Sequence, residues 1–543
     1  MSYNLSELFE RVVDAVPERE AVASPGRRLT YAELDERANR LAHHLEAAGV
    51  GAGDHVGLQL LNGTEYLEGM LAAFKLRAVP INVNYRYVER ELHHLFDDAD
   101  LVAVLFSRQF GPRVGAVAAR LPELHLLVVV EDGTDEPVPE GAVAYEEALA
   151  AGSSDRGFEG RSDDDVFCAY TGGTTGMPKG VLWRHEDIFF AALGGGDPLL
   201  DKGPLQDPDD LPGRIPEFPL VQLCAPPLMH VSASWGAFNA FFGGGKVVLL
   251  APGRFDPVEA WEAVGRERVT ALTVVGDAMA RPLLDALAKE PDGFDVSSLF
   301  VFASGGAILS PAIKAEIGRL LPNVIIVDTF GSSETGVAGS RSSGADGAGA
   351  RFTVDASTAV LDDELRPVAP GSGKVGRLAR RGHVPLGYYK DEAKTKATFV
   401  EADGVRWVLP GDMATVDDDG TVVLLGRGSG SINTGGEKVF PEEVEAVLKG
   451  HPAIYDALVV GVPDDRWGER VAAVVQSRPG ADVTLDDLQA HARSELAGYK
   501  VPRDVVLVDE IRRGPNGKPD YAWAKEHARA ELTSSSRSPR RPG

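Results

Sequence analysis

Apolar positions along the first two thirds of the chain alternate between helical spacing and short continuous runs. Thr30 and Glu33 form a capping box, and apolar residues follow it at three- and four-residue intervals up to Leu45. Runs that predict buried strands lie between such helices, at 55–61, 79–83 and 101–106, and similar units recur at 221–250 and 269–330. This alternation predicts an α/β fold with parallel sheets covered by helices.

The pattern changes near residue 352, where short strands and turns replace the β–α rhythm. Two segments rich in glycine and other loop-forming residues, 192–216 and 337–350, predict surface loops, the second of them flexible. We expect a large N-terminal domain at 1–426 with a β-rich subdomain at about 352–426, a hinge at 427–431, a small mobile α+β domain at 432–531 and a disordered tail at 532–543.

Charge narrows the range of partners. The chain of 543 residues has 55 Lys+Arg against 81 Asp+Glu, a net charge of −26, which repels nucleic acid and anionic membrane surfaces. Any nucleotide must therefore be held by local donors.

No apolar stretch is long enough to span a membrane, and the N-terminus lacks the features of a signal peptide. The only two cysteines, Cys168 and Cys224, lie in apolar runs, which predicts buried thiols in a reducing, cytoplasmic compartment.

Residues 170–180, Tyr-Thr-Gly-Gly-Thr-Thr-Gly-Met-Pro-Lys-Gly, follow an apolar run that predicts a buried strand. Glycines allow backbone N–H groups to turn toward a ligand, and threonine hydroxyls and Lys179 add donors that suit phosphate. The segment therefore predicts a polyphosphate cradle rather than a merely flexible surface loop. It is not the common P-loop, in which Ser or Thr follows the lysine and holds magnesium. The metal must be held elsewhere.

Four further segments occur in order after this loop. They are Phe-Gly-Ser-Ser-Glu at 330–334, Pro-Gly-Asp at 410–412, Gly-Arg at 426–427 with Thr-Gly-Gly-Glu-Lys at 434–438, and Pro-Asn-Gly-Lys at 515–518. With them the chain resembles the adenylate-forming superfamily of acyl-CoA synthetases, nonribosomal adenylation domains and luciferases, over roughly residues 5–525. The segments at 181–187 and 432–439 are most similar to actinobacterial fatty-acyl-CoA ligase-type enzymes.

The resemblance implies an enzyme with two half-reactions. ATP and Mg²⁺ convert a carboxylic acid into an acyl-adenylate with release of pyrophosphate, and the acyl group then passes to the thiol of CoA. The resemblance is also compatible with a homodimer.

The resemblance assigns roles to individual residues. Lys518 would bridge the attacking carboxylate and the α-phosphate, Glu334 would hold magnesium, Ser333 would contact the α-phosphate, Asp412 would accept both ribose hydroxyls, and Arg427 would add a ribose or phosphate contact. Adenine would stack on Phe330. The remaining nucleotide-binding positions are Thr171, Gly172, Gly173, Thr174, Thr175, Gly176, Lys179, Gly306, Ala307 and Gly331.

Some of these residues also have plain structural interpretations. Glu334 could be a helix-cap or surface carboxylate, and Asp412 fits an ordinary turn after Pro-Gly. His230, which the resemblance places as a gate between the acid pocket and the thiol tunnel, could be a hydrogen-bonded core histidine.

The second half-reaction requires Lys518 to move away from the adenylate. Small residues at the joint suit a rotation of the C-terminal unit. Gly435 and Gly436 would then line the pantetheine tunnel. The hinge position usually carries Asp or Lys in this superfamily, and this chain has Ser429 there. No clear basic cluster for the 3′-phosphate of CoA is present.

Other functions stay open at this stage. The acceptor could be a carrier protein, or the activated oxyanion could be nitrite for diazotisation in secondary metabolism. A nucleotide-binding module without catalysis predicts loss of Lys518 or Glu334, yet both are present. A P-loop phosphotransferase is disfavoured because Gly-Lys-Ser/Thr is missing.

Overall fold

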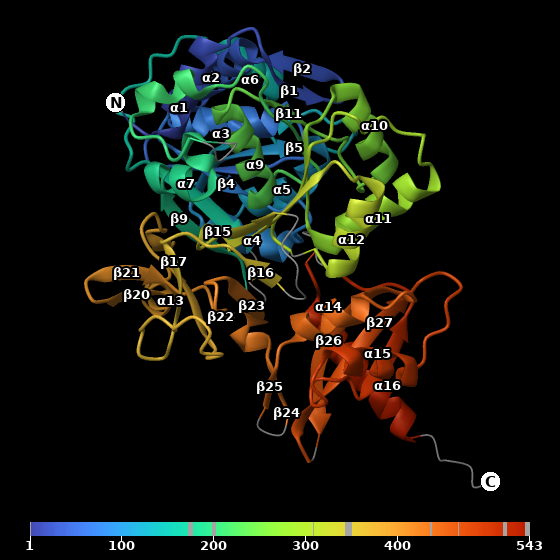
Figure 1. Cartoon of the computed structure of the whole chain (residues 1–543). Coiled ribbons are helices and arrows are strands. Elements are labelled where there is room, and N and C mark those ends of the chain that lie inside the picture. Colours follow the sequence, from blue (N-terminus) through green and yellow to red (C-terminus); the bar gives the residue numbers. More distant parts are fainter. Residues whose placement is uncertain are drawn as a thin grey trace, which may run out of the picture.

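The computed structural model describes residues 2–171, 177–197, 202–307, 309–342, 350–434, 437–464, 466–513 and 518–537. The predicted α/β class is confirmed: two large sheets with parallel centres form the N-terminal body, and helices cover them (Figure 1).

Sheet A has six parallel strands with one antiparallel strand at each edge. Its order is β15 (Gly336–Ser342), β14 (Ile325–Ser332), β13 (Val301–Ser304), β12 (Ala271–Val274), β10 (Val221–Cys224), β11 (Lys246–Val248), β1 (Glu20–Ser24) and β2 (Arg27–Thr30). Sheet B has six parallel strands and is extended at one edge by two strands that join through antiparallel pairings. Its order is β19 (Gly387–Tyr388), β9 (Lys179–Arg184), β8 (Val166–Thr171), β4 (Val79–Asn82), β3 (His55–Gln59), β5 (Leu101–Ser107), β6 (Leu126–Val130) and β7 (Val143–Ala144).

The largest apolar cluster lies between these two sheets and explains the layering. It joins side chains of both sheets to α1 (Leu5–Ala15), α2 (Tyr31–Ala47), α3 (Thr64–Lys75), α6 (Tyr145–Ala151), α7 (His185–Ala192) and α9 (Val231–Phe242). The outer face of sheet A packs on α10 (Pro257–Glu267), α11 (Gly276–Lys289) and α12 (Pro311–Leu320). The outer face of sheet B packs on α4 (Glu89–Asp98) and α5 (Gly111–Ala118).

Shorter pieces of helix complete this body: η1 (Arg108–Phe110), η2 (Gly194–Gly196), η3 (Pro208–Asp210) and α8 (Leu211–Arg214). Cys168 and Cys224 are buried thiols, as predicted. The capping box is also confirmed, because Thr30 Oγ1 accepts from the Glu33 amide at 3.2 Å and Glu33 Oε2 accepts from the Thr30 amide at 2.8 Å.

Two smaller sheets follow in the chain. Sheet C is antiparallel, with the order β16 (Ala350–Phe352), β23 (Val422–Arg427), β22 (Asp412–Val416), β18 (Gly376–Arg380), β21 (Val405–Val408) and β20 (Phe399–Ala402); β17 (Thr358–Leu361) pairs with β18, and α13 (Glu392–Thr398) precedes β20. The turn η4 (Gly428–Gly430) leads from sheet C to sheet D.

Sheet D belongs to the C-terminal unit. Its order is β25 (Glu437–Val439), β24 (Ile432–Thr434), β27 (Gly468–Ser477) and β26 (Ile454–Asp464), and β28 (Asp504–Val508) pairs with β27. One apolar cluster joins the sheet to α14 (Pro441–Lys449) and α15 (Leu485–Glu495), and a second joins it to α16 (Tyr521–Arg537). In Figure 1 this unit (red) lies next to α11 and α12.

Two local expectations differ from the structure. Residues 337–342, expected in a flexible loop, belong to β15, because their backbone pairs antiparallel with the edge of β14. The helix α16 extends to Arg537, into the segment expected to be disordered.

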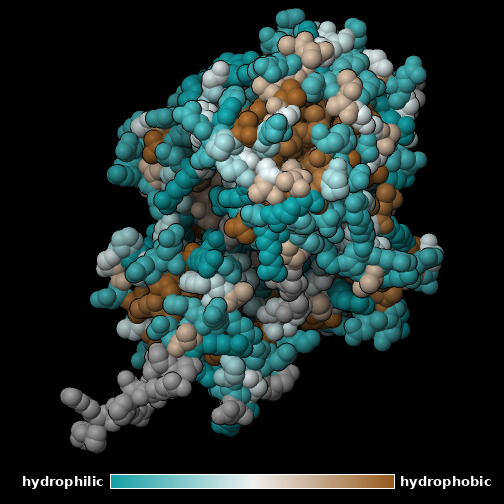
Figure 2. Space-filling view, turned by 180° about the vertical axis from the view of Figure 1, so that it is seen from behind, coloured by the Kyte–Doolittle hydropathy of each residue, from teal (hydrophilic) through white to brown (hydrophobic). Residues whose placement is uncertain are grey.

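The surface seen in Figure 2 is mainly hydrophilic, and its most extensive hydrophobic area lies on the N-terminal body. Among the helices of the described residues, none combines the length and the apolarity needed to cross a membrane.

Candidate active site

The predicted phosphate loop connects two paired strands. β8 ends at Thr171 and β9 begins at Lys179, and these two residues are opposite each other in the antiparallel pair. Lys179 Nζ forms an ion pair with Asp391, the N-cap residue of α13. The loop positions Gly172, Gly173, Thr174, Thr175 and Gly176 lie outside the described residues, so their roles stay predictions.

The end of β14 carries the predicted magnesium carboxylate. The fully buried Trp183 donates from Nε1 to the Ser333 carbonyl at 2.9 Å, which anchors the turn. The Glu334 amide donates to Ser332 Oγ at 3.2 Å. Tyr388 donates its hydroxyl to Glu334 Oε1 at 2.7 Å. The carboxylate is thus held from sheet B while the Glu334 backbone is held by its own turn, which a free surface carboxylate would not be.

Phe330 and Gly331 precede that turn. The Phe330 ring packs on Phe352, with centroids 4.6 Å apart, and is 8% exposed. Stacking of adenine on this ring therefore stays a prediction. Gly331 is required by packing, since a Cβ there would lie 1.9 Å from the Gly336 carbonyl oxygen.

The ends of neighbouring strands supply the predicted adenine floor. Gly306 is exposed with φ +84°, a conformation that favours glycine. The Ala307 carbonyl accepts from Ser304 Oγ at 2.8 Å, and the same hydroxyl accepts from the Gly276 amide at 3.0 Å. These bonds connect the ends of β12 and β13 at the carboxyl edge of sheet A, where ligands bind in open α/β sheets.

Asp412 and Arg427 are opposite each other on β22 and β23. Arg427 Nε lies 3.4 Å from Asp412 Oδ1. Burial raises the pKa of Asp412, Glu334 adds to that rise, and Arg427 and Lys518 oppose it. A carboxylate in this setting can accept hydrogen bonds from a diol while a guanidinium stays beside it.

Lys518 comes from the C-terminal unit, yet it faces the same group. The residue is exposed on one side, and nearby protein atoms lower the pKa of Lys518 by desolvation. Arg427 lowers this pKa further, while Glu334 and Asp412 raise it. The structure thus brings together four predicted residues that lie far apart in the sequence: Glu334, Asp412, Arg427 and Lys518. Gly435 and Gly436, the predicted tunnel glycines, lie outside the described residues.

His230 is the N-cap residue of α9 and is partly buried. Its carbonyl accepts from the Ala233 amide at 2.9 Å. Val231, the next residue, lines a small cavity. The other lining residues are Leu58, Tyr66, Met70, Pro80, Asn82, Phe167, Cys168 and Ser234. His230 itself does not line this cavity, and its role as a gate stays a prediction.

A magnesium site fits the residues present. Within the described ranges, no cluster of three or more His, Cys, Asp or Glu side chains could hold a metal ion. Mg²⁺ is commonly bound through one or two carboxylates together with substrate phosphates and water. A single oriented carboxylate, Glu334, next to a phosphate loop meets that requirement.

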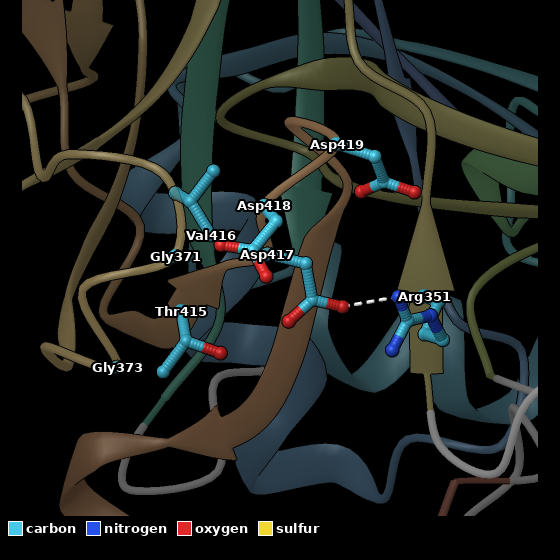
Figure 3. Close-up of a pocket in the computed structure, with 8 residues that line it drawn as sticks. All are labelled: Arg351, Gly371, Gly373, Thr415, Val416, Asp417, Asp418 and Asp419. Atoms are coloured by element: carbon cyan, nitrogen blue, oxygen red, sulfur yellow. Dashed lines mark ion pairs between the residues drawn. The ribbon is translucent and has the colours of Figure 1, made fainter.

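A surface pocket of about 410 Å³ on sheet C contains no predicted site residue (Figure 3). Its lining includes Asp417, Asp418 and Asp419, and Asp417 forms an ion pair with Arg351. This acidic lining repels a triphosphate, so the pocket is not the nucleotide site.

Sequence analysis missed Tyr388 as a partner of Glu334 and Trp183 as the anchor of the Ser333 turn. Trp183 had a partial signal, because it lies in the segment that follows the phosphate loop. Tyr388 had none, since its contact with Glu334 joins residues 54 positions apart.

Glu442, in the first turn of α14, should make the folding stability of the protein depend on pH. Burial and the nearby Glu445 raise its pKa to about 7. Because the folded state binds this proton more tightly, Glu442 favours folding at low pH, and the contribution is lost as pH rises toward 7. Glu442→Gln should leave stability unchanged near pH 4.5 and raise it at pH 8.5, on the order of 2 kcal/mol after allowance for partial exposure. Thermal unfolding at both pH values checks this, and equal melting temperatures at pH 8.5 would contradict it.

Comparison with known proteins agrees with this geometry. The profile of the AMP-binding enzyme family matches residues 9–389, and that of the AMP-binding enzyme C-terminal domain matches residues 443–518. The chain belongs to the family of AMP-binding enzymes. The predicted class, an AMP-forming ligase of the acyl-CoA synthetase type, is confirmed by its relatives.

The 3-oxocholest-4-en-26-oate–CoA ligase of Rhodococcus rhodochrous is 52% identical over 535 residues, 97% of this chain and 96% of that protein. The medium/long-chain-fatty-acid–CoA/3-oxocholest-4-en-26-oate–CoA ligase of Mycobacterium tuberculosis is 48% identical over 534 residues, 98% and 97% of the two chains. These relatives favour CoA over the other acceptors considered from the sequence.

Solved structures share the fold over nearly the whole chain. ATP-bound MatB from Rhodopseudomonas palustris has a TM-score of 0.81 at 26% identity, covering 97% of this chain and 99% of that one. The anthranilate CoA ligase AuaEII in complex with anthranoyl-AMP has a TM-score of 0.85 at 23% identity, covering 98% of both chains. The second likeness is one of fold alone.

Proposed function

We propose that the protein is an ATP-dependent acid–CoA ligase whose acid has a large hydrophobic body, such as a steroid carboxylate or a medium- to long-chain fatty acid. The observation that carries the ligase chemistry is the convergence of Lys518 with Glu334, Asp412 and Arg427. The names of the two relatives support the class of acid.

The residues divide the work of adenylation. Lys518 neutralises the approach of the carboxylate to the α-phosphate, which brings two anions together. Asp412 binds the ribose hydroxyls and Arg427 keeps a positive charge beside them. Glu334 would hold Mg²⁺, which when bound would supply neutralisation of negative charge on the pyrophosphate. Lys179, at the end of the phosphate loop, adds a further cation.

The test is a panel of acids with ATP, Mg²⁺ and CoA, with the thioester products identified by mass. The panel holds a steroid with its carboxylate at carbon 26, fatty acids of several lengths, a benzoate and a short dicarboxylate. We expect thioesters of the steroid or the longer fatty acids to dominate. Preference for the benzoate or the dicarboxylate would contradict the substrate class, and ATP turnover with nitrite and an aromatic amine but no acid would contradict ligation itself.

The C-terminal unit, we further propose, rotates about the joint that contains η4 between the two half-reactions. Its present arrangement is supported by contacts with α11. Lys449 Nζ lies 3.9 Å from Asp277 Oδ2, and the Arg281 guanidinium lies 5.5 Å from the centroid of the Tyr455 ring. These contacts stabilise the arrangement in which Lys518 is near Asp412.

Weakening the contact should therefore separate the half-reactions. Asp277→Asn removes the interdomain charge but keeps an oxygen to accept from the Ser310 amide, a bond of 2.8 Å. We expect adenylation to slow about threefold to tenfold, with transfer from preformed acyl-adenylate to CoA equal or faster. Glu443→Gln is the control, because its ion pair with Lys500 lies within the C-terminal unit. Equal slowing of both half-reactions by Asp277→Asn would count against the rotation.

A further inference from the structure

Two lysines on the short helix α13 have different surroundings. Lys396 is exposed and pairs with Glu392 one turn earlier, at 2.6 Å. Lys394 is half-buried, and its ammonium group lies 4.1 Å from the centroid of the Tyr388 ring. Among the residues that the structure describes, no carboxylate lies within ion-pair distance of Lys394. The ammonium group thus lies on an aromatic face rather than in a close ion pair.

The ring beneath Lys394 belongs to the candidate active site. Tyr388 donates its hydroxyl to Glu334 Oε1 at 2.7 Å, so one side chain connects the ammonium group to the magnesium carboxylate. Asp391 connects the helix that carries Lys394 to the end of the phosphate loop, since this N-cap carboxylate accepts from the Lys394 backbone amide at 2.9 Å and pairs with Lys179. Lys394 therefore lies between the two elements proposed to hold the triphosphate.

Electrostatics agree with this position. Burial lowers the pKa of Lys394; Glu334 and Asp391 oppose that shift, whereas Lys179 and Arg427 add to it. Two further cations thus act on Lys394, in a chain whose net charge is −26. Glu334 and Asp391 offset part of this positive charge, and a bound triphosphate would interact favourably with all three cations.

We propose that Lys394 is a binding residue for the β- and γ-phosphates of ATP and for the pyrophosphate that leaves. This inference rests on the proposed function and adds a residue that no sequence motif indicated. The ring of Tyr388 limits the positions open to the flexible lysine side chain, and a cation over an aromatic face stays charged. When pyrophosphate departs, the same ammonium group loses its anion, so Lys394 acts in the first half-reaction only.

The experiment compares Lys394→Met with Lys396→Met, a matched change two positions along the same helix. We expect Lys394→Met to weaken binding of ATP and of pyrophosphate about tenfold to a hundredfold, as for the loss of one charge-assisted hydrogen bond. Calorimetric titration of the full-length protein measures both, and acid-dependent pyrophosphate exchange should show the same rise in KM. Lys394→Arg should recover most of the affinity. Transfer from preformed acyl-adenylate to CoA should be unchanged, because that step contains no triphosphate.

Two results would overturn the inference. One is equal binding of pyrophosphate by the Lys394→Met and Lys396→Met variants. The other is an equal loss in both half-reactions together with a lower melting temperature, which would assign Lys394 to packing on Tyr388. If the unmodified enzyme showed no acid-dependent exchange, the proposed function would fail, whereas the titrations would still decide the role of Lys394.

Discussion

Lys518→Ala should reduce acid-dependent exchange of pyrophosphate into ATP by about 10²- to 10³-fold, the usual cost of removing one preorganised donor from a developing charge. The charge of Lys518 acts on Glu334, Asp412 and Arg427, the residues proposed to hold ATP and Mg²⁺. The carboxylate of the acid substrate and the α-phosphate of ATP repel each other, and Lys518 is proposed to offset this repulsion. Its loss should therefore lower the rate of adenylation much more than the affinity for ATP.

The same variant should keep the second half-reaction. Preformed acyl-adenylate should react with CoA at a rate close to that of the unmodified enzyme, since Lys518 is proposed to leave before thiolation. Lys525→Ala is the control, because Lys525 lies in the same unit and pairs with Glu469 at 3.0 Å. Exchange that survives Lys518→Ala intact would remove the catalytic assignment.

Glu334→Gln should lower adenylation about 10²- to 10³-fold and raise the Mg²⁺ concentration needed for half-maximal exchange. Glutamine keeps the shape and an oxygen for the Tyr388 hydroxyl, which lies 2.7 Å from Glu334 Oε1, but it lacks the negative charge that a hard cation requires. The decisive measurement is a Mg²⁺ titration of pyrophosphate exchange with each protein.

Tyr388→Phe separates the charge of Glu334 from its orientation. It removes only the hydroxyl that donates to Glu334, so we expect a loss of about tenfold, with a smaller change in Mg²⁺ dependence. If Glu334→Gln and the unmodified enzyme had the same Mg²⁺ dependence, the metal would have to be held elsewhere.

Local patterns predicted individual elements well. The capping box at Thr30 and Glu33 determines where α2 begins, and apolar runs mark β3, β4 and β5, because burial and capping act over a few residues. The layering could not be predicted. In sheet A, β1 pairs with β11, so residues 22–23 lie beside residues 247–248, and no local pattern encodes that pairing.

The candidate site shows the same division between local patterns, which the sequence reveals, and long-range contacts, which it does not. Glycines, threonines and carboxylates at strand ends indicated phosphate chemistry, since those groups act through their own local geometry. Tyr388 and Lys394 gave no such signal, because their role depends on β19 and α13 meeting the end of β14 in space. The approach of Lys518 to Asp412 rested on family resemblance alone. Residues 337–342 were expected in a loop because most of their side chains are small. They form an edge strand because their backbone pairs with β14.

The central claim is that a carboxylate oxygen attacks the α-phosphorus of ATP and later leaves with AMP. Turnover of an ¹⁸O-labelled hydrophobic acid with ATP, Mg²⁺ and CoA, followed by mass analysis of the nucleotide, tests this directly. The account predicts one ¹⁸O atom in AMP for each thioester formed, with the thioester carbonyl retaining the other. Unlabelled AMP, or ADP with the label in inorganic phosphate, would contradict it.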